Sequence, residues 1–221
     1  MNKDRPELSK TKQRFLKYAL IIVLLIYQVW AAFDRSSSVL LGGALIALMI
    51  CGMMLVLALR WDKPAYMDWA IAGYLAFTVG FLMIAPQPAK SFLHEYAVAA
   101  IFGIFFISSF IPPLIGLPPF TLHAARKKVP QVLWSHPAFL RLNAILAYLW
   151  SGIFGICVLS SLIESYFTQL VAPNLLILAF GLPFSSRFSV WYLKRRGITS
   201  QPSSLKEFMV YLPLGFNALA A

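Results

Sequence analysis

The sequence predicts an all-α polytopic membrane protein with six transmembrane helices. Of its 221 residues, 60% are apolar and only 12% are charged, about half the charged fraction of an ordinary soluble domain. Six apolar runs reach or approach the roughly 20 residues that cross a bilayer as a helix. Lysine and arginine collect in alternate connections between these runs. These three observations exclude a water-soluble globule.

The predicted spans are joined by short connections and flanked by two tails. The spans cover residues 15–33, 39–59, 66–84, 96–117, 138–163 and 171–191. Residues 1–14 form a basic tail before a single membrane domain of residues 15–193, and residues 194–221 form a second tail. The basic, polar beginning of the chain differs from a signal peptide, so we expect the first span to be retained.

The positive charges predict that both termini face the cytoplasm. With the amino terminus inside, every lysine and arginine except Arg35 and Lys90 falls in the tails, in a cytoplasmic connection or toward the cytoplasmic end of a span. Cytoplasmic loops of membrane proteins carry an excess of these residues. The net charge of +11 therefore follows from topology, and we expect no nucleic-acid partner.

Pairs of spans form three predicted helical hairpins, and the last two resemble each other. Residues 68–77 read DWAIAGYLAF, and residues 142–151 read LNAILAYLWS. Each of these hairpins ends in a Gly-Leu-Pro motif, at Gly116 and Gly181, followed by hydroxyl groups and a basic block. The pattern predicts a hairpin duplication. Chance similarity between apolar segments is the alternative.

Prolines interrupt the cytoplasmic ends of the fourth and sixth spans. The fourth apolar stretch would be about 39 Å long as one helix, which exceeds the roughly 30 Å hydrocarbon core. A proline inside a helix removes a backbone donor and clashes with the preceding turn. We therefore predict helix breaks, the first near Ile111. The prolines are Pro112, Pro113, Pro118, Pro119 and Pro183. Two interpretations stay open: simple helix ends, or broken helices that line a substrate cavity.

Polar residues near these breaks predict a pocket for an anion or polar solute. Arg187 precedes Lys194 by about 10 Å of helical rise, so it falls below the headgroup charges in the inner leaflet. An intramembrane charge is a functional candidate, whereas an arginine that extends to the headgroups is not. The duplication would match Thr121 with Ser185 and His123 with Arg187. The predicted pocket comprises Thr121, His123, Asn143, Ser185, Ser186 and Arg187. Asn143 equally suits a contact between helices.

Basic blocks beside aromatic residues predict contact with anionic lipid headgroups. The residues are Arg126, Lys127, Lys128, Lys194, Arg195 and Arg196. Each Lys or Arg near an anionic membrane surface contributes about 1 kcal/mol to binding. Trp and Tyr near the span ends are typical of membrane interfaces. Further candidate partners are a small solute, a second copy of the chain and another membrane protein.

The sequence contains no recognisable motif for a metal, a cofactor or catalysis. Its three histidines, His94, His123 and His136, lack the short helical spacing of zinc ligands. Cys51 and Cys157 lie within predicted spans, which is unlike a disulfide framework. Nucleophile-elbow, phosphate-loop and zinc-protease motifs do not occur. We expect no metal and no cofactor, and an enzyme that modifies lipid through His123 or His136 is the weakest of three functional classes.

The segment PFTLHAARKKVPQVLWSHPAFLRLN at residues 119–143, followed by YLW at 148–150, resembles a group of small bacterial inner-membrane proteins. Some of that group are similar to intracellular septation protein A. The resemblance implies a multi-pass protein of the bacterial inner membrane with a role in the cell envelope, and it brings no catalytic residues. The sequence as a whole favours a small transporter or channel-like protein. The alternative is a non-catalytic envelope protein that binds lipids or partner proteins through its basic cytoplasmic face.

Overall fold

A computed structural model describes residues 25–31, 37–61, 64, 66–126, 129, 131–163 and 165–197. The described residues form helices and connections but no strand, which confirms the all-helical prediction for this part of the chain. Five helices are long and apolar enough to cross a membrane. They are α2 (Ser37–Trp61), α3 (Tyr66–Ile84), α5 (Ala97–Leu114), α7 (Pro137–Ser161) and a continuous last helix over Phe167–Arg195.

These five helices correspond to the second to sixth predicted spans, with ends that shift by a few residues. The first predicted span falls mostly outside the described residues, and its described part, residues 25–31, is helical. The amino-terminal tail and residues 198–221 also lie outside the described part of the chain.

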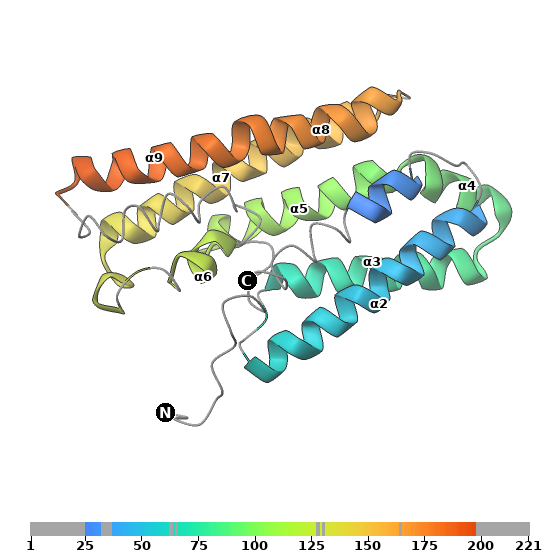
Figure 1. Ribbon diagram of the computed structural model, residues 1–221, viewed down its shortest axis with the longest axis horizontal. Helices are drawn as coiled ribbons and strands as arrows, with labels where there is room; N and C mark the ends of the chain where they lie inside the picture. Colours follow the sequence, from blue (N-terminus) through green and yellow to red (C-terminus); the bar gives the residue numbers. More distant parts are fainter. Residues whose placement is uncertain are drawn as a thin grey trace.

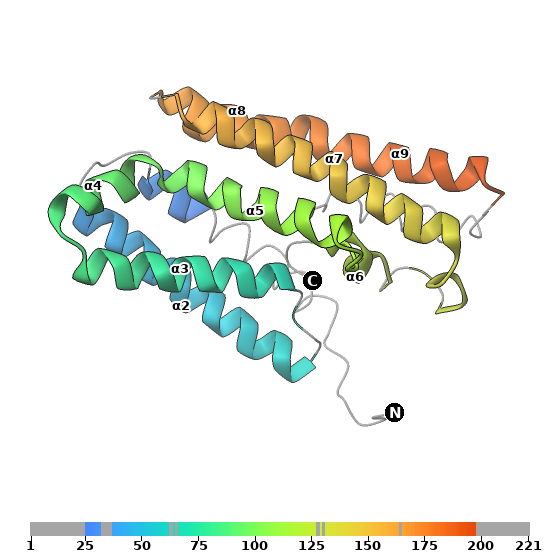
Figure 2. The same ribbon diagram turned by 180° about the vertical axis from the view of Figure 1, so that it is seen from behind.

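The long helices run side by side along the long axis of the molecule (Figures 1 and 2). The most extensive pairings are α5 with α7, the last helix with α7, and α2 with α3, whereas the contact between α3 and α5 is smaller. The last helix and α7 correspond to the two spans of the third predicted hairpin. The two spans of the second predicted hairpin, α3 and α5, contact each other less than each contacts another helix.

Short helices occupy both ends of the bundle. Helix α4 (Gln87–Glu95) lies in the connection between α3 and α5, and begins after Pro86 with Pro88 in its first turn. At the opposite end, α6 (Phe120–Arg126) and one 3₁₀ turn, η1 (Gln131–Leu133), connect α5 to α7. Helix α7 then begins at Pro137, where the Ala138 amide donates a hydrogen bond to His136 Nδ1 at 3.2 Å.

Helix α5 continues through Pro112 and Pro113, so the predicted break near Ile111 is wrong. Pro112 lacks the amide hydrogen that would bond the Ser108 carbonyl, and the Tyr66 hydroxyl donates to that carbonyl at 3.1 Å instead. A neighbouring side chain of this kind lets a helix tolerate proline in an apolar environment.

The end of α5 follows at Gly116, which has a φ of 79°. The Leu117 amide donates to the Pro112 carbonyl at 2.8 Å, and the Gly116 amide donates to the Pro113 carbonyl at 3.4 Å. This pair of hydrogen bonds is the Schellman arrangement, which needs a left-handed residue and so favours glycine. Pro118 and Pro119 lie outside the helices, between α5 and α6, in agreement with their predicted role.

The last helix also continues through its prolines, so the predicted break at Pro183 is wrong as well. Two π-helical segments, η2 (Phe167–Val171) and η3 (Leu176–Gly181), alternate with the α-helical segments α8 (Ala172–Leu175) and α9 (Leu182–Arg195). The Ala172 amide donates to the Phe167 carbonyl, and the Leu182 amide donates to the Ile177 carbonyl. Pro173 directly follows Ala172, and Pro183 directly follows Leu182, so each proline comes right after the residue whose amide closes a wider turn. Local π-helical geometry compensates for the missing proline donors.

Four buried polar side chains form two hydrogen-bonded pairs. Ser151 on α7 donates to Ser109 on α5 at 2.9 Å. The hydroxyls of Tyr27 and Tyr74 lie 2.9 Å apart, and Tyr74 donates to the Ala97 carbonyl at 3.0 Å. Such hydrogen bonds between helices are common in membrane proteins and contribute about 0.6 kcal/mol each.

Candidate functional site

Two of the predicted pocket residues meet where α6 packs on α7. The buried Thr121 hydroxyl donates to the backbone carbonyl of Asn143 at 2.8 Å. The Asn143 amide nitrogen donates to the Phe139 carbonyl one turn earlier, also at 2.8 Å. The side-chain oxygen of Asn143 is buried and accepts no hydrogen bond from the described residues. The Thr121 hydroxyl therefore joins α6 to the backbone of α7, whereas the Asn143 side chain bonds to its own helix.

Ser185 and Ser186 bond to their own helix. Ser185 donates to the Gly181 carbonyl and Ser186 to the Pro183 carbonyl, each at 2.7 Å. No hydrogen bond links either serine to Thr121 or Asn143 within the described residues, and both serines lie on α9. The three hydroxyl groups of the predicted pocket therefore all donate to backbone carbonyls: Thr121 to α7, and Ser185 and Ser186 to their own helix.

His123 and Arg187, which the predicted duplication matches, lie in different environments. His123 is half-buried on the short helix α6, whereas Arg187 is exposed on the long helix α9. Arg187 makes no hydrogen bond or ion pair with any described residue. The two side chains therefore differ in exposure and in the helix that carries them, unlike the equivalent positions that the duplication predicts.

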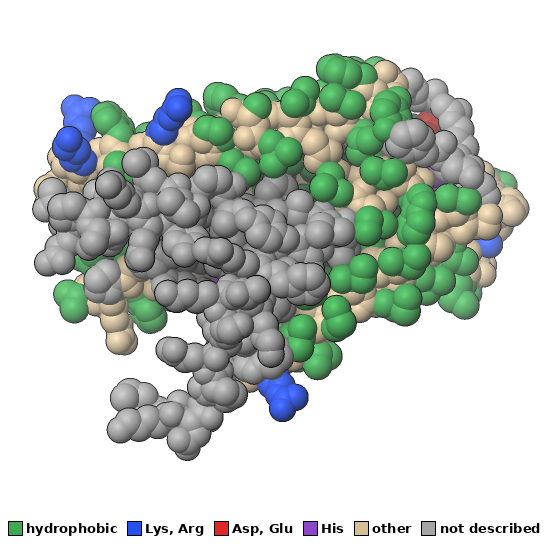
Figure 3. All heavy atoms as spheres, in the orientation of Figure 1, with side chains coloured by type: hydrophobic (Ala, Val, Ile, Leu, Met, Phe, Trp, Pro, Cys, Tyr) green, Lys and Arg blue, Asp and Glu red, His purple; other side chains and the backbone are tan. Residues whose placement is uncertain are grey.

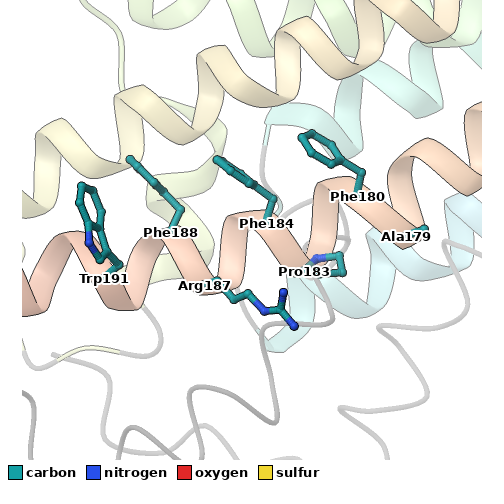
Figure 4. A pocket seen from close by; sticks show the side chains of 7 residues that line it. All are labelled: Ala179, Phe180, Pro183, Phe184, Arg187, Phe188 and Trp191. Atoms are coloured by element: carbon teal, nitrogen blue, oxygen red, sulfur yellow. The ribbon is translucent and has the colours of Figure 1, made fainter.

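Arg187 borders an open groove along the last helix with a volume of about 460 Å³. Its lining is almost wholly apolar: Ala179, Phe180, Pro183, Phe184, Phe188 and Trp191 accompany Arg187. Figure 4 shows Phe180, Phe184, Phe188 and Trp191 leaving one side of the helix and Arg187 leaving the other. Thr121, His123, Asn143, Ser185 and Ser186 do not line this groove.

The aromatic side of the groove is an ordered row of rings. Phe180 and Phe184 stack with centroids 5.4 Å apart, and Phe184 and Phe188 stack at 5.8 Å. Phe188 then contacts Trp191 at 5.7 Å. Side chains four residues apart are neighbours on a helix, so the spacing of the phenylalanines builds the row. That spacing was visible in the sequence and was the signal that the sequence analysis missed.

Cations and aromatic rings form pairs at the same end of the bundle. The guanidinium carbon of Arg195 lies 5.4 Å from the Trp191 ring centroid, and that of Arg196 lies 5.7 Å from the Tyr192 centroid. Arg126, at the end of α6, stands over Trp134 at 5.6 Å. Figure 3 shows Lys and Arg side chains at the left end, over the last turns of α9. We call Arg126, Lys194, Arg195 and Arg196 the basic end.

Two of the predicted lipid contacts, Lys127 and Lys128, lie outside the described residues. Around them, the Trp134 indole nitrogen lies 3.1 Å from both the Arg126 and the Val129 carbonyl oxygens and donates to them. Trp134 therefore ties the connection after α6 back onto itself and holds its ring beside Arg126.

The described residues contain no group of three or more His, Cys, Asp or Glu side chains placed to hold a metal ion. Cys51 and Cys157 are buried free thiols. No family model matches the chain, and no curated protein and no solved structure matches it.

Proposed function

We propose that the protein is a non-catalytic integral membrane protein that binds anionic lipid headgroups through its basic end. Five helices long and apolar enough to cross a membrane are compatible with an integral membrane protein. The observation that carries the proposal is the set of three cation–aromatic pairs at one end of the bundle. Aromatic rings beside basic side chains suit the headgroup region, where Trp and Tyr concentrate.

The same proposal includes the finer topology. We infer six spans, with the helical residues 25–31 belonging to the first, and both termini on the side that carries the basic end. This orientation follows from the positive-inside distribution of Lys and Arg. We further infer that the protein resides in a bacterial inner membrane, which rests on the sequence resemblance alone.

The residues assigned to a solute pocket give less support to transport. Thr121, Ser185 and Ser186 donate their hydroxyl protons to backbone carbonyls, so those donors are already used. Lipid binding instead uses cations whose side chains are exposed, as Lys194, Arg195 and Arg196 are. We therefore prefer the lipid-binding function to the transporter.

The first prediction tests the basic end by removing its charges. Arg126, Lys194, Arg195 and Arg196 are all changed to glutamine, and thermal unfolding is followed in micelles doped with phosphatidylglycerol or phosphatidylcholine. The wild-type protein should be stabilised more by phosphatidylglycerol. The variant should lose up to about 4 kcal/mol of that preference, because each basic residue contributes about 1 kcal/mol near an anionic surface.

The matched control is Lys90→Gln, on α4 at the opposite end of the bundle. It removes one positive charge and should leave the preference for phosphatidylglycerol unchanged. Equal stabilisation of the wild-type protein by both lipids would overturn the proposed function.

A further inference from the structure

We propose that the groove on the last helix binds one anionic phospholipid, with its phosphate on Arg187 and an acyl chain along the apolar lining of the groove. This inference rests on the proposed function, because it specifies a single lipid site and its occupant beyond the general attraction of the basic end. It also differs in residues, since Arg187 is not part of the basic end.

The charge of Arg187 suits a phosphate. Arg195, Arg196 and Arg126 each lie over an aromatic ring, whereas Arg187 has no ring, carboxylate or backbone carbonyl as a partner among the described residues. A guanidinium presents several donors in a planar fork that matches two phosphate oxygens. Arg187 is exposed beside an apolar surface, so an anion that reaches it leaves part of its water shell.

The position of Arg187 along the helix suits a headgroup phosphate. About 30 Å of helical rise separates Phe167 from Arg187, which equals the thickness of the hydrocarbon core. If the last helix enters the membrane near Phe167, Arg187 lies at the inner boundary of the hydrocarbon. The turns from Phe188 to Arg195 then lie among the headgroups, where Trp191 and Arg195 form their pair.

The apolar lining extends from Arg187 toward the middle of the membrane. Phe184, Phe180, Pro183 and Ala179 line this part of the groove, and Figure 4 shows Pro183 on the same side of the helix as Arg187. A ligand that fits has its charge at the interface and a long apolar chain directed inward, which describes a phospholipid better than a soluble anion. The last helix also faces outward: 22% of its span is buried inside the protein, against 33% to 44% for the other four.

Site-specific photo-crosslinking tests this assignment in the full-length protein. Phe184 is replaced by the photoreactive p-benzoyl-phenylalanine, and the protein is reconstituted in nanodiscs with equal amounts of phosphatidylglycerol and phosphatidylcholine. Mass spectrometry then identifies the crosslinked lipid. We expect phosphatidylglycerol to be enriched about fivefold, the factor that corresponds to about 1 kcal/mol for one basic residue near an anionic surface.

Four further variants identify the source of the enrichment. Arg187→Gln should return the crosslinked lipid to the bulk ratio, and Arg187→Lys should keep part of the enrichment. Ala179→Phe should reduce the total lipid yield by filling part of the groove. Arg60→Gln, at the end of α2, removes the same charge elsewhere and should leave the enrichment unchanged.

The outcomes separate this inference from the proposed function. A bulk lipid ratio in the parent protein, or an enrichment that survives Arg187→Gln, overturns the Arg187 site. Crosslinking to a second copy of the chain instead of lipid also overturns it. In each case the proposed function stands if phosphatidylglycerol still stabilises the wild-type protein through the basic end.

Discussion

The two Gly-Leu-Pro motifs have the same three letters and opposite structural results. At Gly116 the chain leaves helix α5 through a left-handed glycine, and Pro118 follows outside any helix. At Gly181 the glycine is helical, with φ near −57°, and Pro183 lies in the first turn of α9. The first motif ends a helix and the second lies within one.

The difference shows that proline alone does not end a helix, since α5 also continues through Pro112 and Pro113. At Gly116 the left-handed glycine turns the chain out of α5, and Pro118 and Pro119 follow outside it. Before Pro183, the chain adopts wider turns that bond carbonyl groups one residue further back. The two glycines also serve different purposes. One supplies a positive φ, and the other allows α7 to approach closely.

Breaking the close approach at Gly181 should have the largest effect on stability. A Cβ added there would lie 3.0 Å from an atom of the Trp150 ring and 3.1 Å from an atom of Ile153. Gly181→Ala should therefore destabilise the protein by about 1 to 3 kcal/mol, the usual cost of overpacking. Reversible unfolding in mixed detergent micelles measures this change.

The control for that substitution is Gly152→Ala on α7, where an added Cβ meets nothing within 4 Å. Alanine favours a helix over glycine by about 1 kcal/mol, so this variant should be neutral or more stable. Equal destabilisation at both positions would show that the contact with Trp150 is unimportant.

Changing Gly116 should have the next largest effect, for a different reason. Space is open around its missing side chain, but its φ of 79° is unfavourable for alanine. Gly116→Ala should cost about 1 to 2 kcal/mol, measured in the same unfolding assay. Gly116→Asn should cost less, because asparagine tolerates the left-handed region better. An asparagine variant as unstable as the alanine variant would contradict the conformational explanation.

The hydroxyl groups that follow the two motifs should have the smallest effects. Thr121→Val removes a buried hydrogen bond between α6 and α7 and should cost about 0.6 to 1.7 kcal/mol. Ser185→Ala removes only a bond to its own helix, so its cost should be smaller. Parallel unfolding measurements compare the two. A larger cost at Ser185 would mean that its hydroxyl contributes more than this local bond.

The sequence was sufficient for the five long helices of the described residues because apolar length is a local property. The third span, residues 66–84, agrees with α3 at both ends. The course of the chain at Pro112 and Pro183 depended instead on a distant hydroxyl, Tyr66, and on π-helical turns. Neither has a local sequence signature.

The candidate site shows the same limit. Composition drew attention to Arg187 and to the basic blocks, and the pocket assigned to Thr121 and Ser185 assumed that similar motifs have similar surroundings. Packing decides those surroundings, since Thr121 contacts α7 and Ser185 bonds to its own helix. The row of phenylalanines on the last helix was predictable from its four-residue spacing, once that face of the helix is known to point outward.

Electron paramagnetic resonance of spin-labelled lipids tests the central claim most directly. In vesicles that contain the wild-type protein, the motionally restricted fraction of labelled phosphatidylglycerol is compared with that of labelled phosphatidylcholine. We predict a larger restricted fraction for phosphatidylglycerol, which decreases with added salt because ions screen charges at a surface. We also predict that it decreases when the four residues of the basic end become glutamine. Equal fractions for the two lipids at low salt would contradict the account.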